Sequence, residues 1–126
     1  MTIEWIIFCR AFKNVGDNGP SIIGLITKFG APKLPVTMDM ALAIRFTGTS
    51  GEKAEFAFHV VDEQSKVVAS GKLPVVVIPY ARDFTDAGIP IKLKIERLGR
   101  FTVAIHSTSG SQSKIAWFDV DPGVVH

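Results

Sequence analysis

The chain has 126 residues, of which 47% are hydrophobic and 21% charged, and its formal net charge is +2. This length is typical of one domain, residues 1–126, with a core that needs no disulfide staples. So small a net charge does not predict the clustered basic surface that nucleic-acid binding requires. Cys9 is the single cysteine, which excludes an intrachain disulfide.

The first ten residues are apolar but are interrupted by Glu4 and ended by Arg10, which is not typical of a secretory signal. No apolar run approaches the ~20 residues that a membrane-spanning helix needs. We therefore expect a cytoplasmic protein that binds neither membrane nor nucleic acid.

Short apolar runs alternate with turn-forming residues in the first half of the chain, which predicts strands. The cleanest alternation runs from Met38 to Phe46, where every second side chain faces one way. The run from Ile3 to Phe12 is apolar on both faces and predicts a central, covered strand. Gly24 predicts a bulge or a close backbone approach. We expect strands at 3–12, 21–29, 38–46 and 56–60, a wide loop at 14–20, and turns at 30–35, 48–53 and 62–65.

The second half holds an irregular stretch and then the clearest pair of strands. Val75–Ile78 has strong strand propensity, but prolines bracket it, so we expect a short edge strand or an extended crossover. Residues 81–88 have room for one helical turn. From Ile91 to Ile105, apolar and polar residues alternate on both sides of Leu98-Gly99, which predicts two strands joined by a turn. Further strands are expected at 66–71 and 114–120, the last after a polar turn at 107–113.

About eight strands without βαβ alternation predict an all-β protein. The expected architecture is an antiparallel two-sheet sandwich with Greek-key or jelly-roll-like connections. A closed barrel is the alternative.

The residues that carry chemistry do not form a catalytic pattern. The segment 48–53 contains glycines and a lysine, but a strand follows it where a phosphate-binding loop needs a helix. Cys9 lies among apolar neighbours, which predicts a buried, inert thiol. We predict no catalytic residue, no cofactor and no enzymatic activity.

Histidines and aspartates raise the question of a metal ion. His59 and His106 both lie on the polar faces of their strands and could meet across neighbouring strands, which leaves a weak surface metal site open. His126 ends the chain, and the three histidines lack metal-ligand spacing. The aspartates of the end loops form no calcium-binding pattern. No metal is therefore predicted; the aspartates considered are Asp83, Asp86, Asp119 and Asp121.

Some surface residues remain without a role in the core. The strand 114–120 is apolar on both faces, so Trp117 indicates contact with a partner. Val75 and Val77 form an unprotected apolar edge. Basic residues on the strand after Pro90 form either a solvated face or a surface for an anion or acidic partner. The predicted partner surface consists of Lys92, Lys94, Arg97, Val75, Val77 and Trp117.

Three motifs occur in a familiar order. Phe8-Cys9-Arg10-Ala11 ends the first apolar strand, Ser21-Ile22-Ile23-Gly24-Leu25-Ile26 follows a glycine-containing loop, and Leu98-Gly99-Arg100-Phe101-Thr102-Val103 opens a late strand. In this order they resemble the motifs of a family of small bacterial and phage-associated proteins. That family is described only as a domain of unknown function. Arg10 stands where that family has aspartate, and Phe101 where it has tyrosine. The resemblance implies a compact β-sandwich and no activity or catalytic residue.

These observations favour a non-enzymatic β-sandwich that acts as a protein-interaction or assembly module, with a protein partner or by self-association. The alternative is a small-ligand module for a carbohydrate or an anion, which would use Trp117 or the basic residues Lys92, Lys94 and Arg97.

Overall fold

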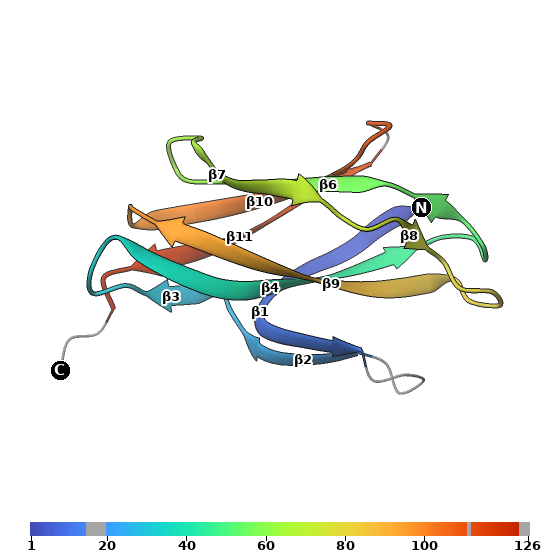
Figure 1. The fold of residues 1–126 in the computed structure, drawn as a ribbon, viewed down its shortest axis with the longest axis horizontal. Coiled ribbons are helices and arrows are strands. Elements are labelled where there is room, and N and C mark those ends of the chain that lie inside the picture. The colour runs from blue at the N-terminus through green and yellow to red at the C-terminus, as the bar shows by residue number, and fades with distance from the viewer. Residues whose placement is uncertain (15–19, 111, 124–126) are drawn as a thin grey trace.

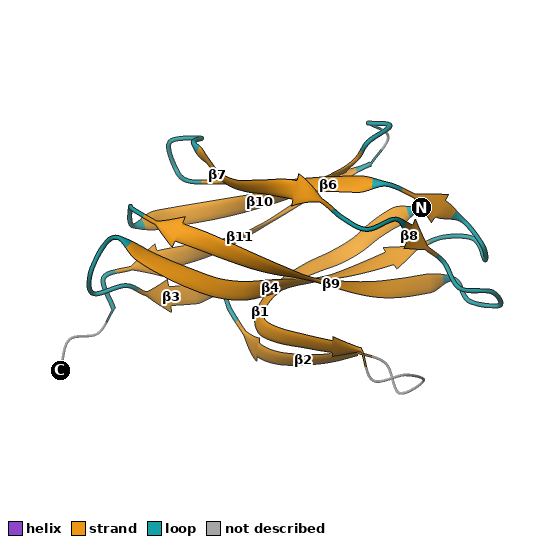
Figure 2. Ribbon diagram, in the orientation of Figure 1, coloured by secondary structure: helices purple, strands orange, loops and turns teal. Residues whose placement is uncertain are grey.

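Two β-sheets pack face to face in the computed structural model, which describes residues 1–14, 20–110 and 112–123 (Figure 1). Strands and loops make up these ranges, as Figure 2 shows. No helix in them is long and apolar enough to cross a membrane. The expected all-β sandwich is confirmed, and the two separate sheets exclude the closed-barrel alternative.

The four-stranded sheet is antiparallel and has the order β2-β1-β4-β9. The two central strands, β1 and β4, are long. In β4 the alternation of apolar side chains continues well beyond five residues. Its strands are β1 (Thr2–Asn14), β2 (Pro20–Leu25), β4 (Val36–Thr47) and β9 (Phe84–Ile95).

The five-stranded sheet has the order β3-β11-β10-β6-β7. Its strand pairs are antiparallel except for β3 and β11, which run parallel, a pairing that the sequence did not predict. Two further strands, β5 (Lys53–Ala54) and β8 (Val76–Val77), pair only with each other. The members of the larger sheet are β3 (Lys28–Gly30), β6 (Phe56–Val61), β7 (Val67–Lys72), β10 (Gly99–Ser107) and β11 (Ser113–Asp121).

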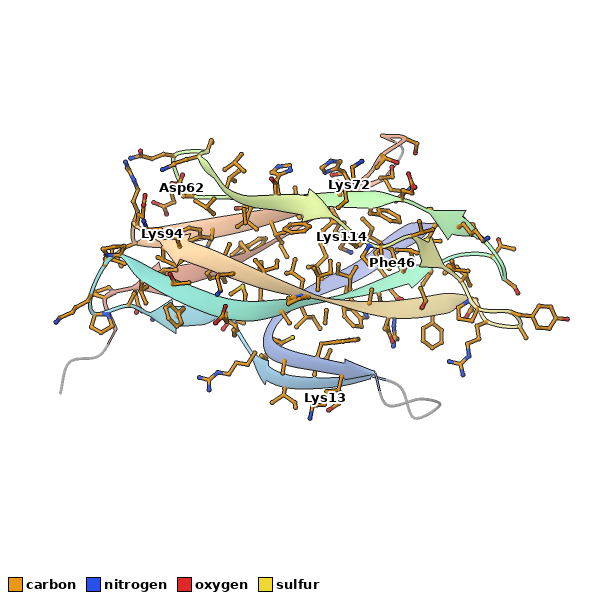
Figure 3. All side chains as sticks on the ribbon, in the orientation of Figure 1. Lys13, Phe46, Asp62, Lys72, Lys94 and Lys114 are labelled. Carbon is orange, nitrogen blue, oxygen red and sulfur yellow. The ribbon has the colours of Figure 1, made fainter. Side chains whose placement is uncertain are left out.

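The core lies between the two sheets and is built from one face of each strand. Aromatic rings interlock there: Phe8 meets Phe118 edge-on at 4.8 Å between ring centroids, and Phe101 stacks on Phe118 at 5.4 Å. Phe46, labelled in Figure 3, lies between the sheets and packs against Phe56. The predicted alternation of 38–46 is confirmed, since every second side chain from Met38 to Phe46 is buried in this core.

A hairpin made of β1 and β2 adds a third layer to the four-stranded sheet. In Figure 1 the end of β1 and β2 lie below β4 and β9, on the side away from the core. This layer buries a second apolar cluster of Cys9, Ala41 and Ala43. Gly88 of β9 lies directly under the Phe12 ring, since a Cβ at Gly88 would come within 2.2 Å of that ring. The prediction that β1 is covered on both sides is confirmed for Phe8 and Cys9, which are buried, while Trp5, Ile6 and Ile7 are only partly buried.

Several predicted boundaries were wrong. No helical turn spans 81–88, because β9 begins at Phe84 and pairs with β4 along its full length. The expected strand 21–29 is divided: β2 ends at Leu25 and β3 starts at Lys28 in the other sheet, while Ile26 donates its N–H to the carbonyl of Phe8. The turn in 48–53 exists but connects two different sheets. The described ranges hold eleven strands rather than eight.

Other predicted positions are confirmed or lie outside these ranges. Gly24 has a φ of +69°, and a Cβ there would lie 2.9 Å from the Arg10 side chain, so the close approach is real. The expected edge strand at 75–78 is present as β8. Most of the wide loop expected at 14–20 lies outside the described residues, as does His126.

Candidate functional site

Exposed apolar side chains gather on the side of the five-stranded sheet that faces away from the core. Because side chains alternate along a strand, the strand registers arrange this surface in rows. We call it the outer face. Its three rows are Val67–Val61–Thr102–Trp117, Ser70–His59–Ala104–Ile115 and Lys72–Ala57–His106–Ser113.

Large apolar side chains stand at the two margins of the outer face. Trp117 is 53% exposed, Ile115 57% and Val67 55%. The strands between them carry the short side chains Thr102 and Ala104 and the imidazoles of His59 and His106. In Figure 3 Lys72 projects from this face, away from the core. The outer face thus combines exposed apolar side chains at its margins with polar ones, among them the two histidines and Lys72.

Arg100 and Asp119 form one border of the outer face. The guanidinium donates from Nε and Nη2 to the two carboxylate oxygens at 3.0 and 3.4 Å and lies 5.0 Å from the Trp117 ring. The hydrogen bonds from Arg100 lower the pKa of Asp119, and the same bonds raise the pKa of Arg100. The backbone N–H of Arg100 donates to Glu63 at 3.0 Å. The indole of Trp117 therefore lies beside an exposed ion pair.

His59 and His106 meet near the centre of the outer face. Their strands β6 and β10 are neighbours, and the register sets the two residues diagonally across from each other. The ring centroids lie 5.6 Å apart and the planes are tilted by 52°. The expectation that these two histidines meet across neighbouring strands is confirmed.

Cys9 lies on the far side of the molecule from both histidines. It is fully buried under the β1–β2 hairpin, and its thiol donates to the carbonyl of Ala41 at 3.6 Å. Burial raises the pKa of the thiol. The predicted burial of Cys9 is confirmed, and its thiol lies on the opposite sheet from His59 and His106.

The exposed end of the four-stranded sheet carries a cluster that sequence reasoning missed. Arg45 of β4 donates two hydrogen bonds to Asp86 of β9, at 2.7 and 2.9 Å. Its guanidinium lies 4.5 Å from the Phe84 ring centroid and 5.2 Å from that of Trp5. The only signal in the sequence was a charged residue between buried positions. The pairing of β1, β4 and β9 makes this cluster, and the cluster stabilises that pairing.

A groove of about 620 Å³ runs along the edge of the β1–β2 hairpin. Phe12 of β1 and Ile89 and Pro90 of β9 are among the residues that line it. Arg10, Asp39 and Lys92 bring charge to it. Lys92 and Asp39 form a loose, exposed ion pair at 3.9 Å.

The structure does not bring the six predicted partner residues together. Lys92 and Lys94 point outward from β9, and Arg97 lies in the turn after it. Lys94 pairs with Glu96 at 3.5 Å, so part of the expected basic surface is neutralised. Val75 and Val77, 55% and 41% exposed, lie beside and in β8. Trp117 alone belongs to the outer face.

Three of the four aspartates considered for calcium form ion pairs with basic side chains. Asp86 binds Arg45, Asp119 binds Arg100, and Asp121 pairs with Lys28 at 2.8 Å. Within the ranges that the structure describes, no group of three or more acidic, histidine or cysteine side chains is arranged to hold a metal ion.

Comparison with known proteins does not place the chain in a family. No family model matches it, and no curated protein matches it. Among solved structures, the alkylpurine DNA glycosylase AlkC of Pseudomonas fluorescens, bound to DNA with an abasic-site analogue, is similar over 76% of this chain at 12% identity, with a TM-score of 0.41. The similar region spans 27% of the glycosylase chain.

A superoxide reductase (neelaredoxin) from Ignicoccus hospitalis is similar over 92% of this chain and 83% of its own, at 9% identity and a TM-score of 0.37. A variant of the same reductase is similar over 75% of this chain and 74% of its own, at 10% identity and a TM-score of 0.36. Resemblance this distant carries no argument about function.

Proposed function

We propose that this protein is a non-enzymatic assembly module that pairs with a second copy of itself through the outer face. The observation that carries the proposal is Trp117, a tryptophan left half exposed in the middle of a regular strand. Trp117 shares a row with Val61, Thr102 and Val67, so the exposed indole continues into an apolar stripe across four strands. Removing such a stripe from water favours association.

The area of the outer face predicts how tight this pairing is. One side chain on a sheet face covers about 4.8 Å by 6.7 Å, so three rows of four cover roughly 400 Å². Two copies would bury about 800 Å², against the ~1,600 Å² of a standard stable interface. We therefore expect a weak dimer that forms at high protein concentration.

The sizes of the side chains on the outer face suit a dimer with two-fold symmetry in which the two copies are shifted by one strand. β11 carries the large side chains Ile115 and Trp117, and the neighbouring strand β10 carries the short side chains Thr102 and Ala104 between Arg100 and His106. If β11 of one copy lies over β10 of the other, the indole of Trp117 sits above Thr102 and Ala104. Sheets that pack in this way lie about 10 Å apart, the thickness of an ordinary sandwich core.

Absence of enzymatic activity is part of the proposal. Support comes from Cys9, which is buried on the four-stranded sheet while His59 and His106 lie on the other sheet. A nucleophile and a base must lie within hydrogen-bond reach of each other.

Sedimentation velocity over a wide range of protein concentration tests the proposal. The wild type is expected to shift from monomer toward dimer as concentration rises. Trp117→Lys places a charge in the stripe and is expected to remain monomeric. Leu25→Lys is the matched control, because Leu25 is 66% exposed on β2, outside the outer face, and is expected to behave as the wild type. A wild type that stays monomeric at every concentration, or a Trp117→Lys dimer as stable as the wild type, contradicts the proposal.

A second candidate function rests on the groove beside the hairpin. Its volume falls within the range of ligand sites, its walls are apolar, and two cationic side chains, Arg10 and Lys92, exceed the single carboxylate of Asp39. The corresponding ligand is a small organic anion with an apolar body.

Thermal unfolding in the presence of benzoate, octanoate, phosphate and glucose tests this candidate. Binding of a ligand to the native state raises the unfolding temperature. The apolar carboxylates are expected to stabilise the wild type and to lose this effect in Arg10→Ala, while Lys94→Ala, which changes a lysine outside the groove, keeps it. Equal stabilisation of the wild type and Arg10→Ala would contradict the candidate.

A further inference from the structure

Two imidazoles on the outer face are spaced as a metal ion would need them. His59 and His106 project from adjacent strands on the same side, and each is partly exposed. A sheet fixes both Cα positions, so little chain ordering is needed to bring the rings to one ion. The side chains themselves are the adjustable part.

The measured spacing agrees with chelation. Nitrogen ligands lie about 2.1 Å from Zn²⁺ in tetrahedral geometry, which places the centroids of two bound imidazoles about 5 Å apart. The observed centroid distance is 5.6 Å. The two distances differ by less than about 1 Å, so the strand positions of His59 and His106 are compatible with binding one ion.

The residues around His59 and His106 determine which metal ions the two imidazoles would bind. The three rows of the outer face contain no carboxylate, so the protein offers neutral nitrogen ligands and water completes the coordination. Imidazole suits Cu²⁺, Ni²⁺ and Zn²⁺, whereas Mg²⁺ and Ca²⁺ prefer oxygen ligands. Lys72 shares a row with His106 and adds positive charge nearby, which weakens cation binding.

We propose that His59 and His106 form a two-histidine site for a divalent transition metal ion, with Cu²⁺ bound most tightly. This inference is argued from the two side chains and not from the proposed self-association; because both use the outer face, the dimer and the bound metal would compete. The metal would sit on the apolar surface, within the same sheet face as Trp117.

Titration of the metal-free protein with Cu²⁺, followed by tryptophan fluorescence, tests the site. Bound Cu²⁺ is expected to quench the fluorescence. His59→Gln and His106→Gln are each expected to weaken binding at least about tenfold, because one imidazole then replaces a chelating pair. His126→Gln is the control and is expected to bind as the wild type. Circular dichroism establishes that each variant is folded.

Electron paramagnetic resonance supplies a readout that does not depend on affinity. The spectrum of the Cu²⁺-loaded wild type is expected to show hyperfine coupling to two imidazole nitrogens, and each single variant to one. Binding that is unchanged in both His59→Gln and His106→Gln, or that depends on His126 alone, overturns the proposal.

Discussion

Two arginines occupy comparable positions on the opposite sides of the sandwich. Arg45 binds Asp86 through two N–H groups and lies over Phe84, while Arg100 binds Asp119 in the same way and lies over Trp117. Their burial differs. The side chain of Asp86 is 5% exposed, and that of Asp119 is 45% exposed.

Arg45→Lys is expected to destabilise the protein more than Arg100→Lys. Lysine cannot make both bonds of the guanidinium fork, so buried Asp86 would keep an unpaired oxygen, at a cost of about 1–3 kcal/mol. Asp119 can turn to water, so Arg100→Lys is expected to leave stability close to that of the wild type. Urea unfolding of the three proteins gives the comparison. Equal losses in the two variants would contradict the role assigned to burial.

Cys9 is expected to resist thiol reagents in the native protein. The hairpin covers its sulfur, and burial raises its pKa, so the reactive thiolate is disfavoured at neutral and mildly alkaline pH. Because the pKa of the thiol is raised in the native state, the protonated thiol favours the native state at low pH. This contribution to stability is lost as the pH rises through the ordinary pKa of cysteine and above it.

Reaction with a chromogenic disulfide reagent measures the thiol directly. Native protein is expected to react slowly, at the rate of local opening, and denatured protein at once. Stoichiometric labelling of the native protein within the mixing time would show that the hairpin does not cover Cys9.

At the scale of elements, the β1–β2 hairpin depends on the absence of a side chain at Gly88. Gly88→Ala would place a methyl group against the ring of Phe12 and push the hairpin from β9. We expect a loss of about 1–3 kcal/mol in the free energy of unfolding, as for other overpacked sites. Phe12→Ala removes the ring that clashes, so Gly88→Ala is expected to cost much less in that background. A cost that is the same in both backgrounds would mean that the ring does not lie over Gly88.

Alternation of period two was the part of the sequence that predicted structure well. It correctly assigned the buried side of 38–46, and it identified 114–120 as a strand with two apolar faces, which led to Trp117. Alternation was not sufficient to predict the strand that begins within 81–88, because this strand forms by pairing with β4. Local pattern does not report such distant pairing.

The candidate site was predictable in its parts and not in its assembly. The two histidines were predicted on the polar faces of their strands, and Trp117 on a strand with two apolar faces. That they share one surface depends on the registers of β6, β10 and β11, which no local pattern determines. The stack of Arg45 on Phe84 was missed for the same reason, since the two residues belong to different strands.

For the molecule as a whole, the two sides of the sandwich are unlike. The four-stranded sheet has its outer side covered in part by the β1–β2 hairpin, which is visible below β4 and β9 in Figure 1. The five-stranded sheet keeps half-exposed Trp117, Ile115 and Val67 on its outer side. In the proposed dimer, a second copy of the chain covers this outer face.

The most direct test of this self-association is a concentration series of two-dimensional NMR spectra. The amide signals of Val61, Thr102, Ala104 and Trp117 are expected to move together as protein concentration rises, with one dissociation constant, while those of Leu25 and Lys94 stay in place. Spectra that do not change with concentration, or changes confined to the four-stranded sheet, would contradict it.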